Sequence, residues 1–187
     1  MTTQRIQENE ANDTVTNALQ SLHIDIDARV SAITATKADW PCRRGCDGCC
    51  HRLAQIPELT EAEWRLLQTG LKALAPDVRQ DVYQKAATLS TQTPRKITCP
   101  MLDITTGSCL VYAFRPVACR TYGFYVERDK GLYCSTIEAL VNEGEFFHIV
   151  WGNHDTINRR IAKLGAPRLL VDWMKIDTST NIRKEVD

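Results

Sequence analysis

Four cysteines within nine residues, Cys42, Cys46, Cys49 and Cys50, constrain this chain more than any other feature of its sequence. Two cysteines separated by two residues, as Cys46 and Cys49 are, can turn both thiolates to one side of a tight turn and bind one soft metal ion. Adjacent cysteines in extended backbone point to opposite sides, so Cys49 and Cys50 are also candidates for different ions. The segment therefore predicts a thiolate metal site built on a short turn.

Four further cysteines are spread over the middle of the chain, at intervals too wide for a local motif. They are Cys99, Cys109, Cys119 and Cys134. Two four-thiolate sites would use all eight cysteines, whereas one site would leave four as small buried apolar side chains or as reactive thiols. Both arrangements stay open, and all eight cysteines are candidate ligands. Zinc, iron and an iron–sulfur cluster all accept thiolates, so the sequence does not choose among them.

The expected surroundings of the chain favour metal over disulfides. Its first residues lack the apolar stretch and cleavage site of a secretory signal, which predicts a cytoplasmic protein, and a reducing cytosol keeps structural disulfides rare. No apolar stretch is long enough for a membrane span. Because 23 basic residues balance 23 acidic ones, we expect neither nucleic acid nor a membrane as partner. The eight cysteines make a metal ion the expected ligand.

The pattern of apolar residues predicts a mainly α fold. Residues 1–12 are polar and aperiodic, which predicts a disordered tail. Residues 13–187 are expected to form a single compact domain of helices with irregular cysteine-bearing loops. Its cysteine-cluster core would span residues 40–135, and helical segments over 13–37 and 135–175 would pack around it.

Local signals place several elements. One apolar stripe at helical spacing comprises Val15, Leu19, Leu22, Ile26, Val30 and Ile33. Thr60 and Glu63 form a capping-box pattern that predicts a helix start, and Gly70 is the expected end of that helix. A second helix is expected after Pro76. Between residues 97 and 112, β-branched residues flank a polar turn, which indicates a short hairpin.

The two groups of cysteines together resemble a known family, the CxxCxxCC-type cysteine-cluster proteins that chelate zinc or iron, also called YkgJ-like. The first half of the match is Cys42, Cys46, Cys49 and Cys50 with the glycine before the double cysteine. The second half is Cys99-Pro100-Met101-Leu102, Gly107, Cys109-Leu110-Val111-Tyr112 and Arg115-Pro116-Val117-Ala118-Cys119-Arg120-Thr121-Tyr122. One departure concerns Cys42, which is followed by three residues where the family name has two. The resemblance implies metal chelation and makes Cys42 the weakest of the four ligand candidates.

Three functions remain for such a chain. A metal-binding module with a structural or metal-handling role comes first, and an iron–sulfur redox protein second. The third is a metal-dependent enzyme, since some members of the resembled family look like methylases of flagellin lysines. In that case Arg120 and Tyr122 would line the binding pocket for a cofactor or substrate. The scattered glycines form no GxGxxG fingerprint for a nucleotide-like cofactor, which weighs against the enzyme.

Overall fold

The computed structural model describes residues 2–89, 97–132 and 134–184, and most of these residues lie in helices, so the predicted mainly α fold is confirmed. The chain forms two compact units. Unit 1 comprises Met1–Arg43 and Val117–Ala166, and unit 2 comprises Arg44–Pro116 and Pro167–Asp187. The division into a tail and one domain from residue 13 stays a prediction, and its residues 1, 90–96, 133 and 185–187 lie outside the described residues.

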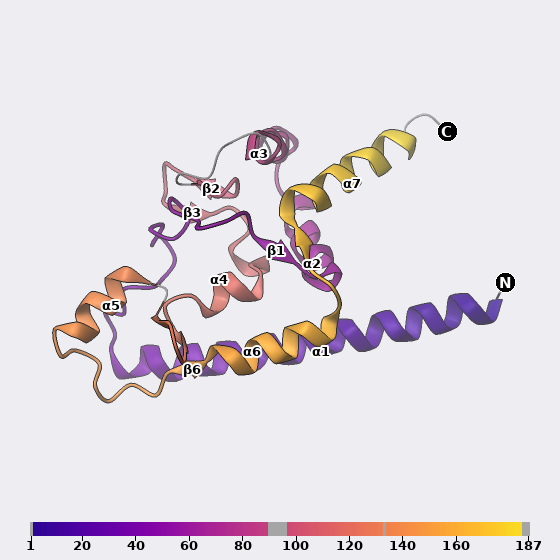
Figure 1. The fold of residues 1–187 in the computed structure, drawn as a ribbon. Helices are drawn as coiled ribbons and strands as arrows, with labels where there is room; N and C mark the ends of the chain where they lie inside the picture. The colour runs from indigo at the N-terminus through magenta and orange to yellow at the C-terminus, as the bar shows by residue number, and fades with distance from the viewer. Residues whose placement is uncertain (1, 90–96, 133, 185–187) are drawn as a thin grey trace. The chain divides into compact units, whose positions relative to one another are not determined.

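Unit 1 is built on a long helix, α1 (Thr2–Thr36), which contacts α4 (Val117–Thr121), α6 (His154–Ile161) and the 3-10 helix η2 (Ala162–Leu164). Figure 1 shows α6 running along α1. The stripe expected from the sequence is the face of α1 that packs, because Leu19, Leu22, Ile26 and Ile33 are buried. The helix begins at Thr2 and so includes residues that the sequence predicted as a tail.

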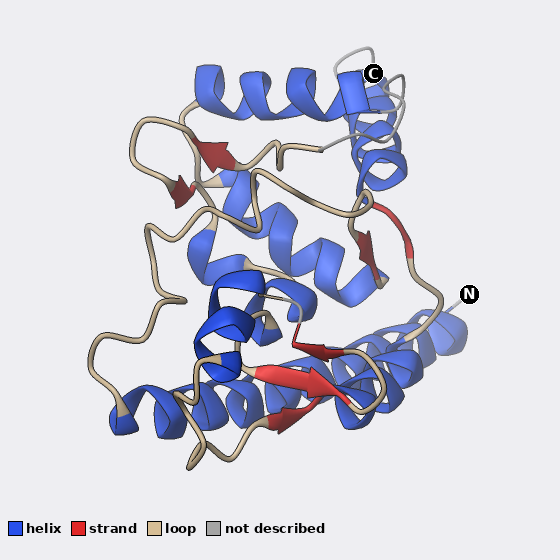
Figure 2. Ribbon diagram, turned by 60° about the vertical axis from the view of Figure 1, so that its left-hand side comes forward, coloured by secondary structure: helices blue, strands red, loops and turns tan. Residues whose placement is uncertain are grey.

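A small sheet completes unit 1. Its central strand β4 (Tyr125–Glu127) pairs antiparallel with β5 (Gly131–Leu132) and parallel with β6 (Gly152–Asn153), and α5 (Ser135–Asn142) follows β5 (Figure 2). A Cβ on Gly152 would lie 2.3 Å from the Tyr125 ring, so only glycine lets these strands approach. Sequence analysis missed this sheet because strands of two or three residues are too short to show alternation.

Unit 2 packs α2 (Glu61–Lys72), α3 (Pro76–Leu89) and α7 (Leu170–Lys184) around an apolar core, beside a short antiparallel pair of β1 (Glu58–Leu59) and β7 (Arg168–Leu169). The predicted capping box is confirmed, because the Thr60 hydroxyl accepts a hydrogen bond from the Glu63 amide and the Glu63 carboxylate accepts one from the Thr60 amide. The expected end of α2 at Gly70 is wrong. A Cβ there would lie 2.6 Å from the Phe114 ring, so this glycine serves packing rather than helix termination.

The predicted hairpin is also present in unit 2. Strands β2 (Leu102–Asp103) and β3 (Ser108–Cys109) pair antiparallel, with Leu102 opposite Cys109, and the 3-10 helix η1 (Tyr112–Phe114) follows. None of the described helices combines the length and apolar character needed to cross a bilayer.

Candidate metal centre

The double cysteine of unit 2 lies in a tight turn. The amide of His51 donates to the Asp47 carbonyl at 3.0 Å, and the amide of Arg52 donates to the Cys49 carbonyl at 3.3 Å. The His51 ring also lies 3.0 Å from the Asp47 carboxylate, which closes the same turn through side chains. The backbone at Cys49 and Cys50 is therefore turned and not extended, so the alternation that would separate their side chains does not apply.

A second segment runs beside this turn. The amide of Cys99 donates to the carbonyl of Cys50 at 2.7 Å, and Leu53 and Ile97 form an antiparallel bridge. The Cys99 side chain interacts with that of Cys50 and raises its pKa, and the Cys99 thiol donates to the Met101 sulfur at 3.8 Å. Backbone pairing thus brings Cys99 beside the double cysteine, although Cys99 and Cys50 are 49 residues apart in the sequence.

The hairpin adds Cys109 to this group. Backbone hydrogen bonds from Leu102 to Cys99 (3.1 Å) and from Leu110 to Met101 (2.9 Å) attach the hairpin to the Cys99 segment. The Cys109 thiol lies within electrostatic range of the thiols of both Cys49 and Cys50. Four thiols from three segments, those of Cys49, Cys50, Cys99 and Cys109, therefore form one neighbourhood, which is called the thiol cluster below.

The turn of the β2–β3 hairpin packs against the turn around the double cysteine, residues 45–52, which is called the cysteine turn below. Gly107 has a φ of +64°, and a Cβ added there would lie 3.1 Å from the Gly45 carbonyl oxygen and 3.4 Å from the Asp47 carboxylate. Only glycine satisfies both the left-handed backbone and this close approach. Gly107, which the sequence motif singled out, therefore helps to hold the hairpin beside the cysteine turn.

The thiol cluster favours protonated sulfurs in the absence of metal. The hydrogen bond to Cys50, followed by burial, raises the pKa of Cys49 far above its usual value. The hydrogen bond from Cys49 lowers the pKa of Cys50, but its own bond to Cys99 and its burial outweigh that effect and raise the pKa to about 12. Burial also raises the pKa of Cys109. Metal ions bind thiolates, so binding here must displace protons.

The donor set suits zinc or iron in kind, since both bind four thiolates. Among the described residues, however, no three His, Cys, Asp or Glu side chains already stand in a group that could hold a metal ion. Within the thiol cluster, the Cys50 side chain interacts with those of both Cys49 and Cys99.

One family model matches the chain over residues 41–143, more than half of its length and a range that contains all eight cysteines. Its description is CxxCxxCC, a "putative zinc- or iron-chelating domain". The chain belongs to this family. No curated protein and no solved structure gives a match to the chain.

The remaining cysteines of this CxxCxxCC protein are divided between the two units. Cys46 is exposed in the loop of unit 2 that precedes the double cysteine. Cys42, Cys119 and Cys134 belong to unit 1. The Cys42 thiol donates to the carbonyl of Tyr122 at 3.3 Å and packs on Gly123, where a Cβ would lie 3.1 Å from its sulfur.

The two residues proposed from sequence to bind a cofactor also lie in unit 1. The guanidinium of Arg120 on α4 forms an ion pair with Asp27 of α1 at 3.2 Å. This contact links two helices, and the carbonyl of Tyr122 accepts the Cys42 thiol. Tyr112 belongs to the second half of the sequence match, but its arginine contacts were not predicted. Its ring lies under the guanidinium group of Arg115 and near that of Arg44.

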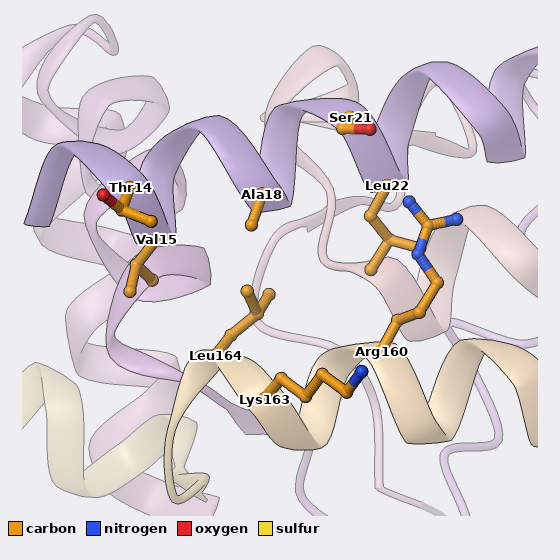
Figure 3. Close-up of a pocket in the computed structure, with 8 residues that line it drawn as sticks. All are labelled: Thr14, Val15, Ala18, Ser21, Leu22, Arg160, Lys163 and Leu164. Carbon is orange, nitrogen blue, oxygen red and sulfur yellow. The ribbon is translucent and has the colours of Figure 1, made fainter. Parts of the chain in front are cut away.

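Unit 1 also contains a shallow hollow of about 330 Å³ between α1 and the α6–η2 segment (Figure 3). Its lining consists of Thr14, Val15, Ala18, Ser21, Leu22, Arg160, Lys163 and Leu164. Leu164 points toward α1, and the two cations lie along the α6 side, where Arg160 forms an ion pair with Asp25 at 2.7 Å. No cysteine lines it, so it is separate from the thiol chemistry.

Proposed function

We propose that this protein chelates one zinc or iron ion through the thiolates of Cys49, Cys50, Cys99 and Cys109. The hydrogen bond from the Cys99 amide to the Cys50 carbonyl, at 2.7 Å, carries the proposal. That bond fixes two segments, distant in sequence, beside each other, and the thiols of Cys50 and Cys99 interact. Four thiolates satisfy the coordination of zinc, and they equally satisfy an iron ion or an iron–sulfur cluster.

The role that we propose for the metal is structural. The thiol cluster joins the cysteine turn, the Cys99 segment and the β2–β3 hairpin, whose described strands are two residues long and which are otherwise linked by a few backbone hydrogen bonds. Closing the long loops between these segments costs chain entropy, and metal that binds only the folded state contributes its binding free energy to folding. The site would thus stabilise a part of unit 2 that has little regular structure.

A metal-handling role is the second candidate, and exposed Cys46 favours it. Its thiol lies at the surface, four residues before Cys50, where a partner could reach it. A solvent-accessible thiolate beside a four-thiolate site is a natural point for exchanging the ion. The proposal places the protein in the reducing cytoplasm, where free thiols persist, with a metal ion as partner.

Metal analysis of anaerobically purified protein tests the proposal. We expect about one metal equivalent per chain, with a colourless protein indicating zinc and a brown one that bleaches on reduction indicating a cluster. Cys50→Ser and Cys99→Ser should lose that metal, whereas the matched control Cys134→Ser, in unit 1, should keep it. Full metal content in both Cys50→Ser and Cys99→Ser would overturn the assignment.

A chelator separates the structural role from the handling role. If the metal is structural, its removal should lower the melting temperature of the wild-type protein. An unchanged melting temperature after complete metal removal, combined with faster metal transfer in wild type than in Cys46→Ser, would favour metal handling instead.

A further inference from the structure

The hollow of unit 1 lies between two rows of side chains on facing helical segments (Figure 3). On α1 the lining residues recur at steps of three and four, so they share one side of the helix; they are Thr14, Val15, Ala18, Ser21 and Leu22. The same spacing on the α6–η2 segment gives Arg160, Lys163 and Leu164. All of these residues belong to unit 1, so one unit forms the whole hollow.

A small side chain on α1 leaves this space open. Ala18 stands about one turn after Val15 and one turn before Leu22, and it is exposed, whereas Leu22 and Leu164 are buried at the base. Figure 3 shows Val15 and Ala18 facing Leu164 across the hollow. The volume of about 330 Å³ is near the lower end of the range for small-molecule sites. The hollow therefore offers an apolar floor on the scale of a small ligand.

Positive charge gathers at one end of this floor. Figure 3 shows the cationic groups of Arg160 and Lys163 toward Leu22 and away from Val15. Arg160 pairs with Asp25 at 2.7 Å, whereas Lys163 is exposed and forms no ion pair within the part of the chain that the structure describes. No Asp or Glu is among the described residues that line the hollow. Two cations beside one carboxylate leave a net positive charge at this end.

We propose that the hollow binds a small organic anion with an apolar tail, of the class of medium-chain fatty acids. Its carboxylate lies against Lys163 and Arg160, and its tail covers Val15, Ala18 and Leu164. The charge selects an anion, and burial of the tail supplies most of the affinity, because exposed ion pairs are weak. No cysteine lines the hollow, so this binding is independent of the proposed metal site.

Sodium octanoate, titrated into the full-length protein and followed by amide chemical shifts, tests the inference. We expect saturable shifts at residues 14–22 and 160–164, and none with acetate, which has the charge without the tail. Ala18→Leu fills the hollow from an exposed position and should abolish octanoate binding. The matched control is Ala28→Leu, at an exposed position of α1 outside the hollow, which should bind octanoate as wild type does.

Charge variants test the cationic end without filling the hollow. Lys163→Gln should bind octanoate roughly 3-fold more weakly than wild type, and Asp25→Asn, which frees Arg160, roughly 2-fold more tightly, because exposed ion pairs contribute modestly. Lys72→Gln removes an exposed lysine of unit 2 and should leave octanoate affinity unchanged.

Three results would overturn the inference. The first is equal octanoate affinity in wild type, Ala18→Leu and Lys163→Gln. The second is inorganic phosphate binding as tightly as octanoate, since charge alone would then account for binding. The third is a wild-type dimer in sedimentation velocity that Ala18→Leu converts to a monomer, since a second copy of the chain would then cover the hollow. Each of these results leaves the proposed function intact, because metal content is measured separately.

Discussion

The thiol of Cys42 donates a hydrogen bond to the carbonyl oxygen of Tyr122, 80 residues further along the chain, at 3.3 Å. Gly123, with a φ of +79°, leaves just enough room for that sulfur. Cys42 therefore has a defined place in unit 1, whereas the thiol cluster belongs to unit 2. Three residues separate Cys42 from Cys46, whereas the family name has two between its first two cysteines. The boundary between the two units falls within these three residues.

The first prediction follows from that contact. Cys42→Ser keeps a donor for the Tyr122 carbonyl, so the variant should fold and retain its metal. Cys50→Ser, in contrast, should lose the metal, because its thiol interacts with those of both Cys49 and Cys99. Elemental analysis of both variants gives the comparison. An empty Cys42→Ser protein beside a fully loaded Cys50→Ser protein would show that the ligands are assigned to the wrong cysteines.

The second prediction concerns the contact between the hairpin and the cysteine turn. Gly107→Ala should weaken zinc binding and destabilise the protein by about 2 kcal/mol, since it adds both left-handed strain and a 3.1 Å contact with the Gly45 carbonyl. Gly131→Ala is the matched control, with a φ of +73° and open space around it. It should cost about 1 kcal/mol from strain alone and leave zinc affinity unchanged. Equal zinc affinities in the two variants would mean that the hairpin contact does not support the site.

The third prediction concerns Gly70, a glycine inside helix α2. Replacing glycine by alanine inside a helix ordinarily stabilises it by about 1 kcal/mol. At Gly70 of α2, the added methyl group would meet the Phe114 ring at 2.6 Å, so Gly70→Ala should destabilise the protein by about 1–2 kcal/mol through overpacking. Denaturant unfolding measures the sign. The double variant Gly70→Ala with Phe114→Leu should recover part of the loss, and a stabilising single substitution would contradict the packing argument.

These glycines show where sequence reasoning succeeds and where it stops. The capping box at Thr60 and Glu63, the stripe on α1 and the β2–β3 hairpin are local, so residue spacing alone predicts them. The purpose of Gly70 depends on Phe114, 44 residues away, and sequence analysis took this glycine for a helix end. Spacing carries no information on such tertiary contacts.

The same limit applies to the candidate site. The sequence supplies eight cysteines and the order of two motifs, but it does not tell which thiols meet. The antiparallel pairing around Cys50 and Cys99 decides that, and it depends on backbone hydrogen bonds between segments 49 residues apart. The contacts of the Tyr112 ring with two arginines could not be predicted from the sequence either, because Arg44 and Arg115 are 71 residues apart.

The fourth prediction concerns His23, a buried residue of α1 that is 8 % exposed and whose Nε2 has no hydrogen-bond partner among the described residues. Burial, together with the nearby charge of Arg120, lowers its pKa from 6.5 to about 4, although Asp27 acts in the opposite direction. Between these two values the unfolded chain binds a proton that the folded chain does not. The stability due to neutral His23 is therefore fully present above about pH 6.5 and is lost as the pH falls toward 4.

Urea unfolding at pH 7 and at pH 4.5 tests this sign. The wild-type protein should lose roughly 2–3 kcal/mol more than His23→Gln does over this interval, because a depressed pKa contributes about 1.4 kcal/mol per unit. His148→Gln, which removes an exposed imidazole, is the matched control for the loss of a histidine. If His23→Gln shows the same loss of stability between the two pH values as wild type, the burial of a neutral imidazole against Arg120 does not govern acid stability, and the ion pair between Arg120 and Asp27 becomes the next group to examine.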